Sequence, residues 1–342
     1  MTVALLSNPA CQEHDTGTHI ENRSRLDAIV EALQANDLYR RLLKPATRPA
    51  TVEQVAAVHD RLYIDRIRSM AQAGGAYLDY DTIVSPGSYR AALAAAGCCI
   101  QAVDTVLSGQ ADVAFALVRP PGHHARPGRG MGFCLFNNIA IAARHALTAY
   151  RLQRVLIVDF DAHHGNGTQE AFYSEADVLY FSTHQSHFYP GTGRLDETGE
   201  GAGRGYTVNV PLPAGTDDAA MERIYDEILL PLARRFQPQI ILVSAGYDIH
   251  WADPLTDLGI SVRGIARIVA TIAAAARLLC EGRAVFTLEG GYERLSLIAA
   301  TAATLRVLLG EDEIIDPLGP CSGRQADVSH LIAQVKRMHR LP

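Results

Sequence analysis

Short runs of apolar, β-branched residues alternate with longer Ala- and Leu-rich stretches along the 342-residue chain. The short runs are continuously apolar, which predicts parallel strands buried on both faces, and the longer stretches predict the helices that cover them. Strands are expected over residues 3–7, 113–118, 155–160, 178–182, 206–210, 240–244 and 284–288. Helices are expected over residues 24–35, 52–59, 88–107, 138–149, 219–236, 261–279 and 295–308.

No internal repeat and no Ser-, Gly- or Pro-rich linker divides this α/β pattern. The glycine-rich segment 191–205 is interpreted as a surface loop, because strand-like sequence resumes on both sides of it. We therefore predict one α/β domain over residues 1–342. Its motif-bearing core lies at about 19–310, and a short C-terminal tail follows at 311–342.

Five of the predicted strands end in polar or glycine-rich clusters, which read RPPGHH, DFDAHHGN, FSTH, SAGYD and LEGGY. Binding sites of parallel sheets form at the carboxyl ends of the strands, so these clusters are expected to meet at one edge. Histidines gather in the same region, since seven of the 13 lie within residues 123–187.

The cluster after the strand at 155–160 predicts a metal site. Asp159, Asp161 and His163 are spaced two apart, so an extended chain presents them on one face. Buried carboxylates are costly unless a cation compensates them, and these ligands suit zinc, iron, cobalt or manganese. Asp248, just past another strand, can add a third ligand, as in a catalytic zinc site with one open position. The alternative is a structural Asp–His network.

Further clusters supply groups for acid–base chemistry. His123 and His124 follow a rigid Pro-Pro-Gly segment, and histidine titrates near neutral pH. Asp159 and Asn166 are candidates for orienting the two imidazoles. Tyr292 can donate its phenol to a carbonyl oxygen, although it could equally be a packing residue. A metal, two histidines and a phenol together predict metal-assisted hydrolysis of a carbonyl compound.

Composition argues against several other classes of protein. The chain has 31 Lys and Arg against 37 Asp and Glu, a net charge of −6, which disfavours nucleic-acid and anionic-membrane partners. No continuous apolar run reaches the roughly 18–20 residues of a membrane span, and the N-terminus lacks a basic signal region. The six cysteines form no C-x-x-C pair, which favours a reducing compartment. We expect a cytoplasmic protein.

Six motifs occur in a characteristic order: RPPGHHA, GFCLFNN, VDFDAHHGNGTQ, FYPGTG, SAGYD followed by DPL, and LEGGY. Together they resemble the histone deacetylase and acetylpolyamine amidohydrolase family, which includes acetoin-utilisation proteins. The resemblance begins at HIENRSRL near residue 20 and covers most of the chain. It implies a single arginase-like α/β domain with an eight-stranded parallel sheet, and hydrolysis of an N-acetyl amide.

The same resemblance implies metal sites. Asp161, His163 and Asp248 match the ligands of one catalytic zinc ion, for which iron(II) or cobalt(II) could substitute. A two-metal, arginase-like centre would need extra carboxylates, which the residues after His163 and Asp248 do not provide. Structural potassium is also implied, at one site near Asp159, Asp161, His163, Ser182 and Thr183 and at a second near Phe172, Val178 and Tyr206.

Catalytic roles follow residue by residue from the resemblance. His124 matches the general acid–base residue, His123 with Asp159 matches its electrostatic partner, and Tyr292 matches the residue that stabilises the oxyanion. Asn166 stands where many deacetylases have Asp, as in the class II subgroup and many bacterial members. The presence of Tyr292 argues against a pseudoenzyme.

The substrate tunnel is implied in the same way. Gly132 and Phe133 in GFC and Tyr189 in FYPGTG match its lining, with Tyr189 in a position that is usually Phe. Leu255 stands at the rim where the polyamine-selective branch has a glutamate, which favours an acetyl-lysine-like substrate. The expected function is therefore a zinc-dependent deacetylase. The alternatives are an acetylpolyamine or small acylated-amine amidohydrolase, and a metal-stabilised binding protein without turnover.

Overall fold

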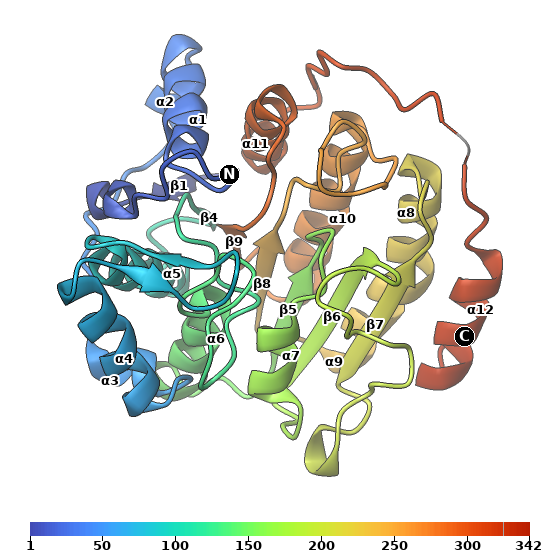
Figure 1. Cartoon of the computed structure of the whole chain (residues 1–342). Coiled ribbons are helices and arrows are strands. Elements are labelled where there is room, and N and C mark those ends of the chain that lie inside the picture. The colour runs from blue at the N-terminus through green and yellow to red at the C-terminus, as the bar shows by residue number, and fades with distance from the viewer. Residues whose placement is uncertain (324) are drawn as a thin grey trace.

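A computed structural model describes residues 1–323 and 325–342, and a parallel sheet of seven strands runs through its centre (Figure 1). The strands lie in the order β1-β4-β9-β8-β5-β6-β7, and every adjacent pair is parallel. Their bounds are Val3–Leu6 (β1), Val113–Ala116 (β4), Val155–Asp159 (β5), Val178–Gln185 (β6), Thr207–Leu212 (β7), Ile240–Ala245 (β8) and Ala284–Leu288 (β9). All the strands predicted from the sequence form.

Within the described residues the sheet has seven strands, where the resemblance implied about eight. On the open side of β1, Leu43 exchanges two backbone hydrogen bonds with the strand, through Leu5 N–H at 2.8 Å and Val3 C=O at 2.9 Å. The pairing stops after this bridge because Pro45 and Pro49 have no N–H to donate. A small antiparallel pair, β2 (Ala76–Tyr77) and β3 (Ile83–Val84), lies apart from the main sheet.

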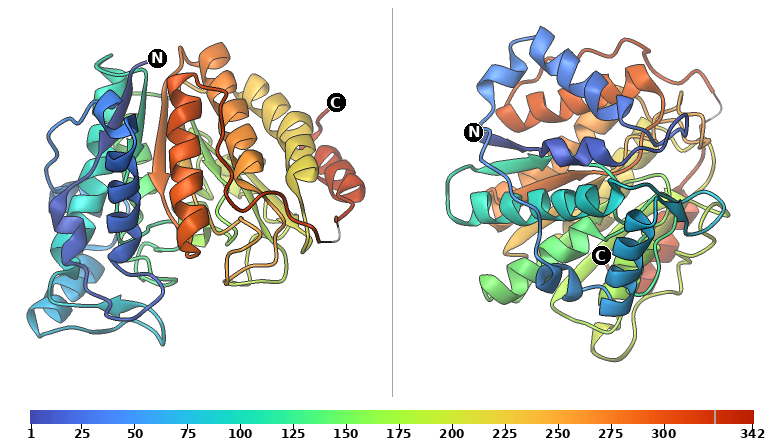
Figure 2. Two further views of the ribbon diagram at one scale, coloured as in Figure 1. Left: turned by 90° about the horizontal axis from the view of Figure 1, so that it is seen from above. Right: turned by 60° about the vertical axis from the view of Figure 1, so that its left-hand side comes forward.

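Helices cover both faces of the sheet (Figure 2). Helices α5 and α6 pack on one face, and α10 and α11 pack on the other. The helices are α1 (Ser24–Ala35), α2 (Leu38–Arg41), α3 (Val52–Ala56), α4 (Arg61–Gln72), α5 (Ser88–Leu107), α6 (Asn138–Ala149), α7 (Asn166–Phe172), α8 (Asp218–Ile224), α9 (Leu230–Phe236), α10 (Val262–Leu279), α11 (Arg294–Leu309) and α12 (Ser329–His339). A π-helical turn, Tyr225–Leu229, joins α8 to α9.

Four helices were not predicted, and one of them, α2, is a single turn. Helix α4 is mostly polar, and only a stripe that includes Ile64 and Ile67 is buried. Helix α7 begins at Asn166, the last residue of the DFDAHHGN motif. The motif was interpreted as part of a site, so no helix was predicted from it. Helix α12 lies in the predicted tail and packs against β7 through the buried Ile332 and Val335, so the tail belongs to the domain.

Helix α5 is long and apolar enough to cross a membrane by length and composition alone. The search of the sequence for a continuous apolar run did not select this helix, because polar residues interrupt the run. Most of the helix is buried against β1, β4 and β9 in the structure, with the small side chains of Cys98 and Cys99 fully enclosed. Its apolar character is therefore that of a core helix.

His59, which follows α3, is buried as a neutral imidazole. Its Nδ1 donates to the carbonyl of Arg126 at 3.0 Å, and its Nε2 accepts from the backbone N–H of Asn137 at 2.8 Å. Burial lowers the pKa of His59 to about 4, against an ordinary value of 6.5. Because the unfolded chain binds this proton more readily, stability is full above pH 6.5 and is lost as the pH falls toward 4.

His59 is therefore expected to make folding acid-sensitive. Between pH 7 and pH 5 it should remove about 2 kcal/mol from the free energy of unfolding. In His59→Gln, an amide can make the same two hydrogen bonds without titrating. Urea denaturation at both pH values should show a smaller loss for this variant than for the wild type. An equal loss in both proteins would contradict the prediction.

Candidate active site

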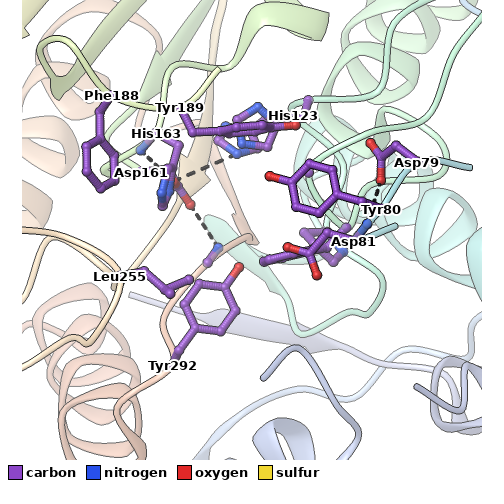
Figure 3. A pocket seen from close by; sticks show the side chains of 15 residues that line it. Asp79, Tyr80, Asp81, His123, Asp161, His163, Phe188, Tyr189, Leu255 and Tyr292 are labelled. Carbon is purple, nitrogen blue, oxygen red and sulfur yellow. Dashed lines mark hydrogen bonds and ion pairs between the residues drawn. The ribbon is translucent and has the colours of Figure 1, made fainter. Parts of the chain in front are cut away.

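A cavity of about 230 Å³ opens at the carboxyl ends of the central strands (Figure 3). Nine residues singled out from the sequence line it: His123, His124, Gly132, Phe133, Asp161, His163, Tyr189, Leu255 and Tyr292. Its wall also includes residues that sequence reasoning missed: Asp79, Tyr80, Asp81, Pro121, Phe188 and Gly290. Of the remaining candidates, Asp159, Asn166 and Asp248 lie behind this wall in contact with its residues.

Asp161, His163 and Asp248 form one cluster, with ligand atoms all within 4.8 Å of one another. His163 Nδ1 lies 3.2 Å from Asp161 Oδ1 and 3.0 Å from Asp248 Oδ2. Both carboxylates are at most 1% exposed. The structure thus brings Asp161, His163 and Asp248 together, and their role as metal ligands remains a prediction.

Backbone amides orient the two carboxylates. Gly290 N–H donates to Asp161 Oδ2 at 2.9 Å, and Ala162 N–H donates to Asp248 Oδ1 at 2.9 Å. A Cβ atom at Gly290 would lie 2.3 Å from Asp248 Oδ2, so only glycine permits this approach. The remaining oxygen of each carboxylate then faces His163 Nδ1.

The charge of the cluster fits a divalent cation. Burial, helped by the neighbouring Asp161, raises the pKa of Asp248 to about 7. Burial alone would lower the pKa of His163, but hydrogen bonds to the two carboxylates outweigh it and raise that pKa to about 10. Without metal, protons therefore compensate the buried negative charge, and a bound cation would take over that role. Two oxygens and one imidazole nitrogen are a donor set that zinc accepts.

His123 and His124 lie beside the cluster, with ring centroids 4.0 Å apart and ring planes inclined by 43°. His123 Nδ1 lies 3.1 Å from Asp159 Oδ2, which also accepts a hydrogen bond from the Tyr180 hydroxyl at 3.0 Å. Burial opposes protonation of His123, but Asp161 and Asp159 raise its pKa to about 10. His123 is therefore an imidazolium in the metal-free protein.

His124 has the opposite electrostatic environment. Its Nδ1 lies 2.9 Å from Asn166 Oδ1, an acceptor, so Nδ1 carries the hydrogen and Nε2 is free to accept a proton. Burial lowers the pKa of His124 well below 6.5, and the neighbouring His123 and His163 act in the same direction. A neutral, oriented imidazole of this kind can serve as a general base.

Glu289 of LEGGY holds the loop that carries the histidine pair, a role that the sequence did not indicate. Its side chain is fully buried, and Oε2 accepts from the N–H groups of Gly122 at 2.6 Å and His123 at 3.2 Å. Oε1 accepts from the Ser244 hydroxyl at 3.1 Å. The feature of the sequence that could have indicated this role is the position of Glu289 directly after a predicted strand.

Tyr292 is held against the opposite wall of the cavity. Its ring lies edge-on to Phe133 at 5.8 Å, and the Arg25 guanidinium lies 4.9 Å above it. Arg25 also donates to the carbonyls of Gly291 at 2.8 Å and Glu289 at 2.7 Å. Arg25 belongs to the HIENRSRL motif, to which sequence reasoning gave no role.

Aromatic side chains and a glycine form the narrow part of the cavity. Phe133 has a left-handed backbone with φ of 68°, fixed where its N–H donates to Thr82 Oγ1 at 3.2 Å. A Cβ at Gly132 would lie 2.4 Å from the His124 ring, so glycine is required there. Tyr189 packs edge-on against His124 at 5.2 Å. The residues that the resemblance implies for a tunnel thus line the same cavity as Asp161 and His163.

Comparison with known proteins agrees with this geometry. Residues 19–308 match the family described as the histone deacetylase domain. The chain belongs to the histone deacetylase family. Within that family it is 42% identical to histone deacetylase 14, chloroplastic, of Arabidopsis thaliana over 327 residues, covering 91% of this chain and 77% of that protein.

Two further comparisons define its place in the family. The chain is 35% identical to polyamine deacetylase HDAC10 of Homo sapiens over 347 residues, covering 98% of this chain but 50% of the human protein. A crystal structure of the HDA15 HD domain superimposes with a TM-score of 0.90 and 35% identity, covering 99% of this chain and 96% of that one. The fold and the deacetylase class predicted from the motifs are confirmed.

The mouth of this histone deacetylase-family pocket is acidic on one side. The turn between β2 and β3 carries Asp79, Tyr80 and Asp81. Asp79 Oδ1 accepts from the N–H groups of Asp81 and Thr82, at 3.0 and 2.7 Å, and so shapes the turn. Asp81 is 43% exposed and lies 2.8 Å from His19 Nε2.

The residues predicted to bind potassium fall into two places. Asp159 and Ser182 are directly paired between β5 and β6, with Asp161, His163 and the buried Thr183 nearby in the chain. Phe172, Val178 and Tyr206 lie at the end of α7, the start of β6 and the residue before β7. Both potassium sites remain predictions.

Proposed function

We propose that this chain is a zinc-dependent deacetylase that hydrolyses an N-acetyl or N-acyl amide to a carboxylate and an amine. The observation that carries the proposal is the cluster of Asp161, His163 and Asp248 in the cavity that also holds His124 and Tyr292. Iron(II) or cobalt(II) would suit the same ligands. This cluster would hold one metal ion. In a second group with ligand spacing, His123, Cys134 and Glu289, the Glu289 carboxylate already accepts hydrogen bonds from Gly122, His123 and Ser244.

Each side chain has a role in this reaction. Zinc bound to the cluster would polarise the amide carbonyl and lower the pKa of a water molecule. His124 Nε2 accepts the proton of the attacking water and later delivers a proton to the leaving nitrogen, so that a C–O bond replaces the C–N bond. The charged His123–Asp159 pair stabilises the negative charge that develops nearby, and the Tyr292 hydroxyl donates to the carbonyl oxygen.

The walls of the cavity favour a flexible acylated side chain. Phe133 and Tyr189 flank a narrow passage suited to an alkyl chain, and Leu255 adds an apolar contact at the rim. An acetyl-lysine-like substrate is therefore our first candidate. The acidic turn at Asp79 and Asp81 favours a second candidate, an acetylated polyamine, because it offers negative charge to a cation outside the tunnel. The human relative named as a polyamine deacetylase supports this alternative.

A substrate panel with metal analysis tests the proposal. Purified enzyme is assayed on an acetyl-lysine peptide, acetylputrescine and acetylspermidine, and its metal content is measured. About one transition-metal ion per chain and hydrolysis of the peptide are expected. A clear polyamine preference would select the second candidate. Two metal ions per chain would favour an arginase-like centre. If the metal-loaded protein hydrolysed none of these substrates, the result would favour a metal-stabilised binding protein without turnover.

Asp81→Asn is expected to weaken binding of cationic substrates specifically. Removing one partly exposed charge should raise the KM for acetylspermidine about 2- to 5-fold at low salt. The increase should shrink at high salt, because screening already weakens the interaction. The KM for an uncharged acetylated amide should stay unchanged. Asp226→Asn, on the exposed face of the π-helical turn, is the matched control, and an equal effect there would contradict a local role for Asp81.

A further inference from the structure

Asp253 connects two segments of the cavity wall and belongs to none of the catalytic groups above. It lies in the loop after β8, five residues beyond the candidate ligand Asp248, and is 4% exposed. From the sequence this position suggests only a loop cap or a supporting residue. Within residues 1–323 and 325–342 no ion pair involves Asp253, so backbone amides alone satisfy its carboxylate.

Both carboxylate oxygens of Asp253 accept hydrogen bonds, and they bind different segments. Oδ1 accepts from the N–H of Leu255 at the tunnel rim, at 3.0 Å. Oδ2 accepts from the N–H groups of Tyr292 at 2.7 Å and Glu293 at 3.2 Å. A single side chain therefore fixes the rim to the segment that carries the tyrosine.

The bond to Tyr292 completes a clamp on one peptide group. Arg25 Nε donates to the carbonyl of Gly291, and Asp253 accepts from the N–H of Tyr292, so the same Gly291–Tyr292 peptide is held at both ends. Gly291 has a φ of 115° and no side chain to limit rotation of this peptide. The clamp thus supplies the restraint that the glycine lacks.

We infer that Asp253 is a positioning residue for Tyr292. By fixing the Gly291–Tyr292 peptide it sets the direction of the phenol relative to the Asp161–His163–Asp248 cluster. This inference rests on the proposed role of Tyr292 as a donor to the carbonyl oxygen. Small displacements of such a donor reduce rate more than binding, because the interaction develops only in the transition state.

The arrangement requires a carboxylate. All three donors facing Asp253 are N–H groups, distributed over both oxygens. In Asp253→Asn, the amide nitrogen would have to face an N–H group on either the rim side or the tyrosine side. The substitution keeps the size of the side chain and the hydrogen bonds to one of the two segments. It therefore separates positioning from simple packing.

The test is a double-mutant cycle on metal-loaded enzyme with the acetyl-lysine peptide. Asp253→Asn is expected to lower kcat about 10- to 100-fold, the cost of small misplacements in an active site. The KM and metal content should stay near the wild-type values. In the Tyr292→Phe background the same substitution should change kcat by less than about 2-fold, because the hydroxyl whose direction Asp253 sets is already gone.

Asp218→Asn is the matched control. Asp218 also connects two segments through its carboxylate, accepting from the N–H and the hydroxyl of Ser261 at 2.8 and 2.5 Å, but it lies outside the cavity. This variant should retain wild-type kcat. If Asp253→Asn lowers kcat equally in both backgrounds, the inference is overturned. It is also overturned if kcat stays unchanged both in Asp253→Asn and in Asp253→Ala, which removes both acceptor oxygens. If Tyr292→Phe itself retains full kcat, the proposed function fails at that residue, which is a distinguishable result.

Amide hydrogen exchange gives a test that needs no variant. The Tyr292 and Leu255 amides of the wild-type protein should be protected well above the level of an exposed loop, because both donate to the buried Asp253. Rapid exchange of the Tyr292 amide would overturn the clamp even if Asp253 variants do not fold.

Discussion

Asp248→Ala is expected to abolish both metal binding and deacetylation. The substitution removes one of three converging ligand atoms and leaves Asp161 and His163 as an incomplete set. Losing the metal removes several kcal/mol of charge stabilisation from the transition state, equivalent to about 10³-fold or more in kcat/KM. Elemental analysis should show about a tenth of the wild-type metal or less.

Thermal unfolding supplies an independent measurement for Asp248→Ala. Adding zinc to chelator-treated wild-type protein should raise its Tm, because the ion binds the folded state selectively. The variant should show no such increase. Asp65→Ala, at an exposed position of α4, is the control and should keep metal, activity and the zinc-dependent Tm. Full metal content in the Asp248 variant would show that the cluster is assigned wrongly.

Tyr292→Phe is expected to lower kcat about 10²- to 10³-fold, the usual cost of removing one oxyanion donor. The ring contacts with Phe133 and Arg25 remain, so the KM, the metal content and the Tm should change little. Steady-state kinetics on the acetyl-lysine peptide measure both constants. This separation of kcat from KM is typical of an interaction made mainly in the transition state.

A surface tyrosine provides the comparison for Tyr292. Tyr150→Phe removes a hydroxyl that donates to Asp104 at 3.0 Å on the protein surface, and Tyr150 does not line the cavity. It should leave kcat at the wild-type value. If Tyr292→Phe behaves like Tyr150→Phe, the phenol does not stabilise the oxyanion.

The central strands and the grouping of Asp161, His163 and Asp248 were predictable because local pattern determines them. Continuous apolar runs marked each strand of the sheet, and the two-residue spacing placed Asp161 and His163 on one face at the end of β5. The same logic placed Asp248 beside them, since β5 and β8 are adjacent and parallel. The site lies at the carboxyl ends of the strands, and the apolar runs in the sequence show where those strands end.

Groups that act across long sequence separations were not predictable in this way. Arg25 reaches the carbonyl of Gly291, 266 residues away, and Glu289 reaches the N–H of Gly122, 167 residues away. Neither contact leaves a local pattern, because each depends on how the elements pack. The acidic turn at Asp79–Asp81 was missed for a related reason, since a short hairpin outside the main sheet gives no hint of which cavity it borders.

The strand order has a consequence for how the chain folds during synthesis. β9, the last strand made, lies between β4 and β8 and is the element that joins β1 and β4 to the rest of the sheet. Until residues 284–288 leave the ribosome, β4 presents an unpaired apolar edge, VAFA, which is the kind of edge that associates with other chains. Arg25 donates to the carbonyls of Glu289 and Gly291, which directly follow β9, so these hydrogen bonds form only after the same segment has been made. The time for which that edge is exposed therefore ends only when residues 284–288 have been made and pair with β4.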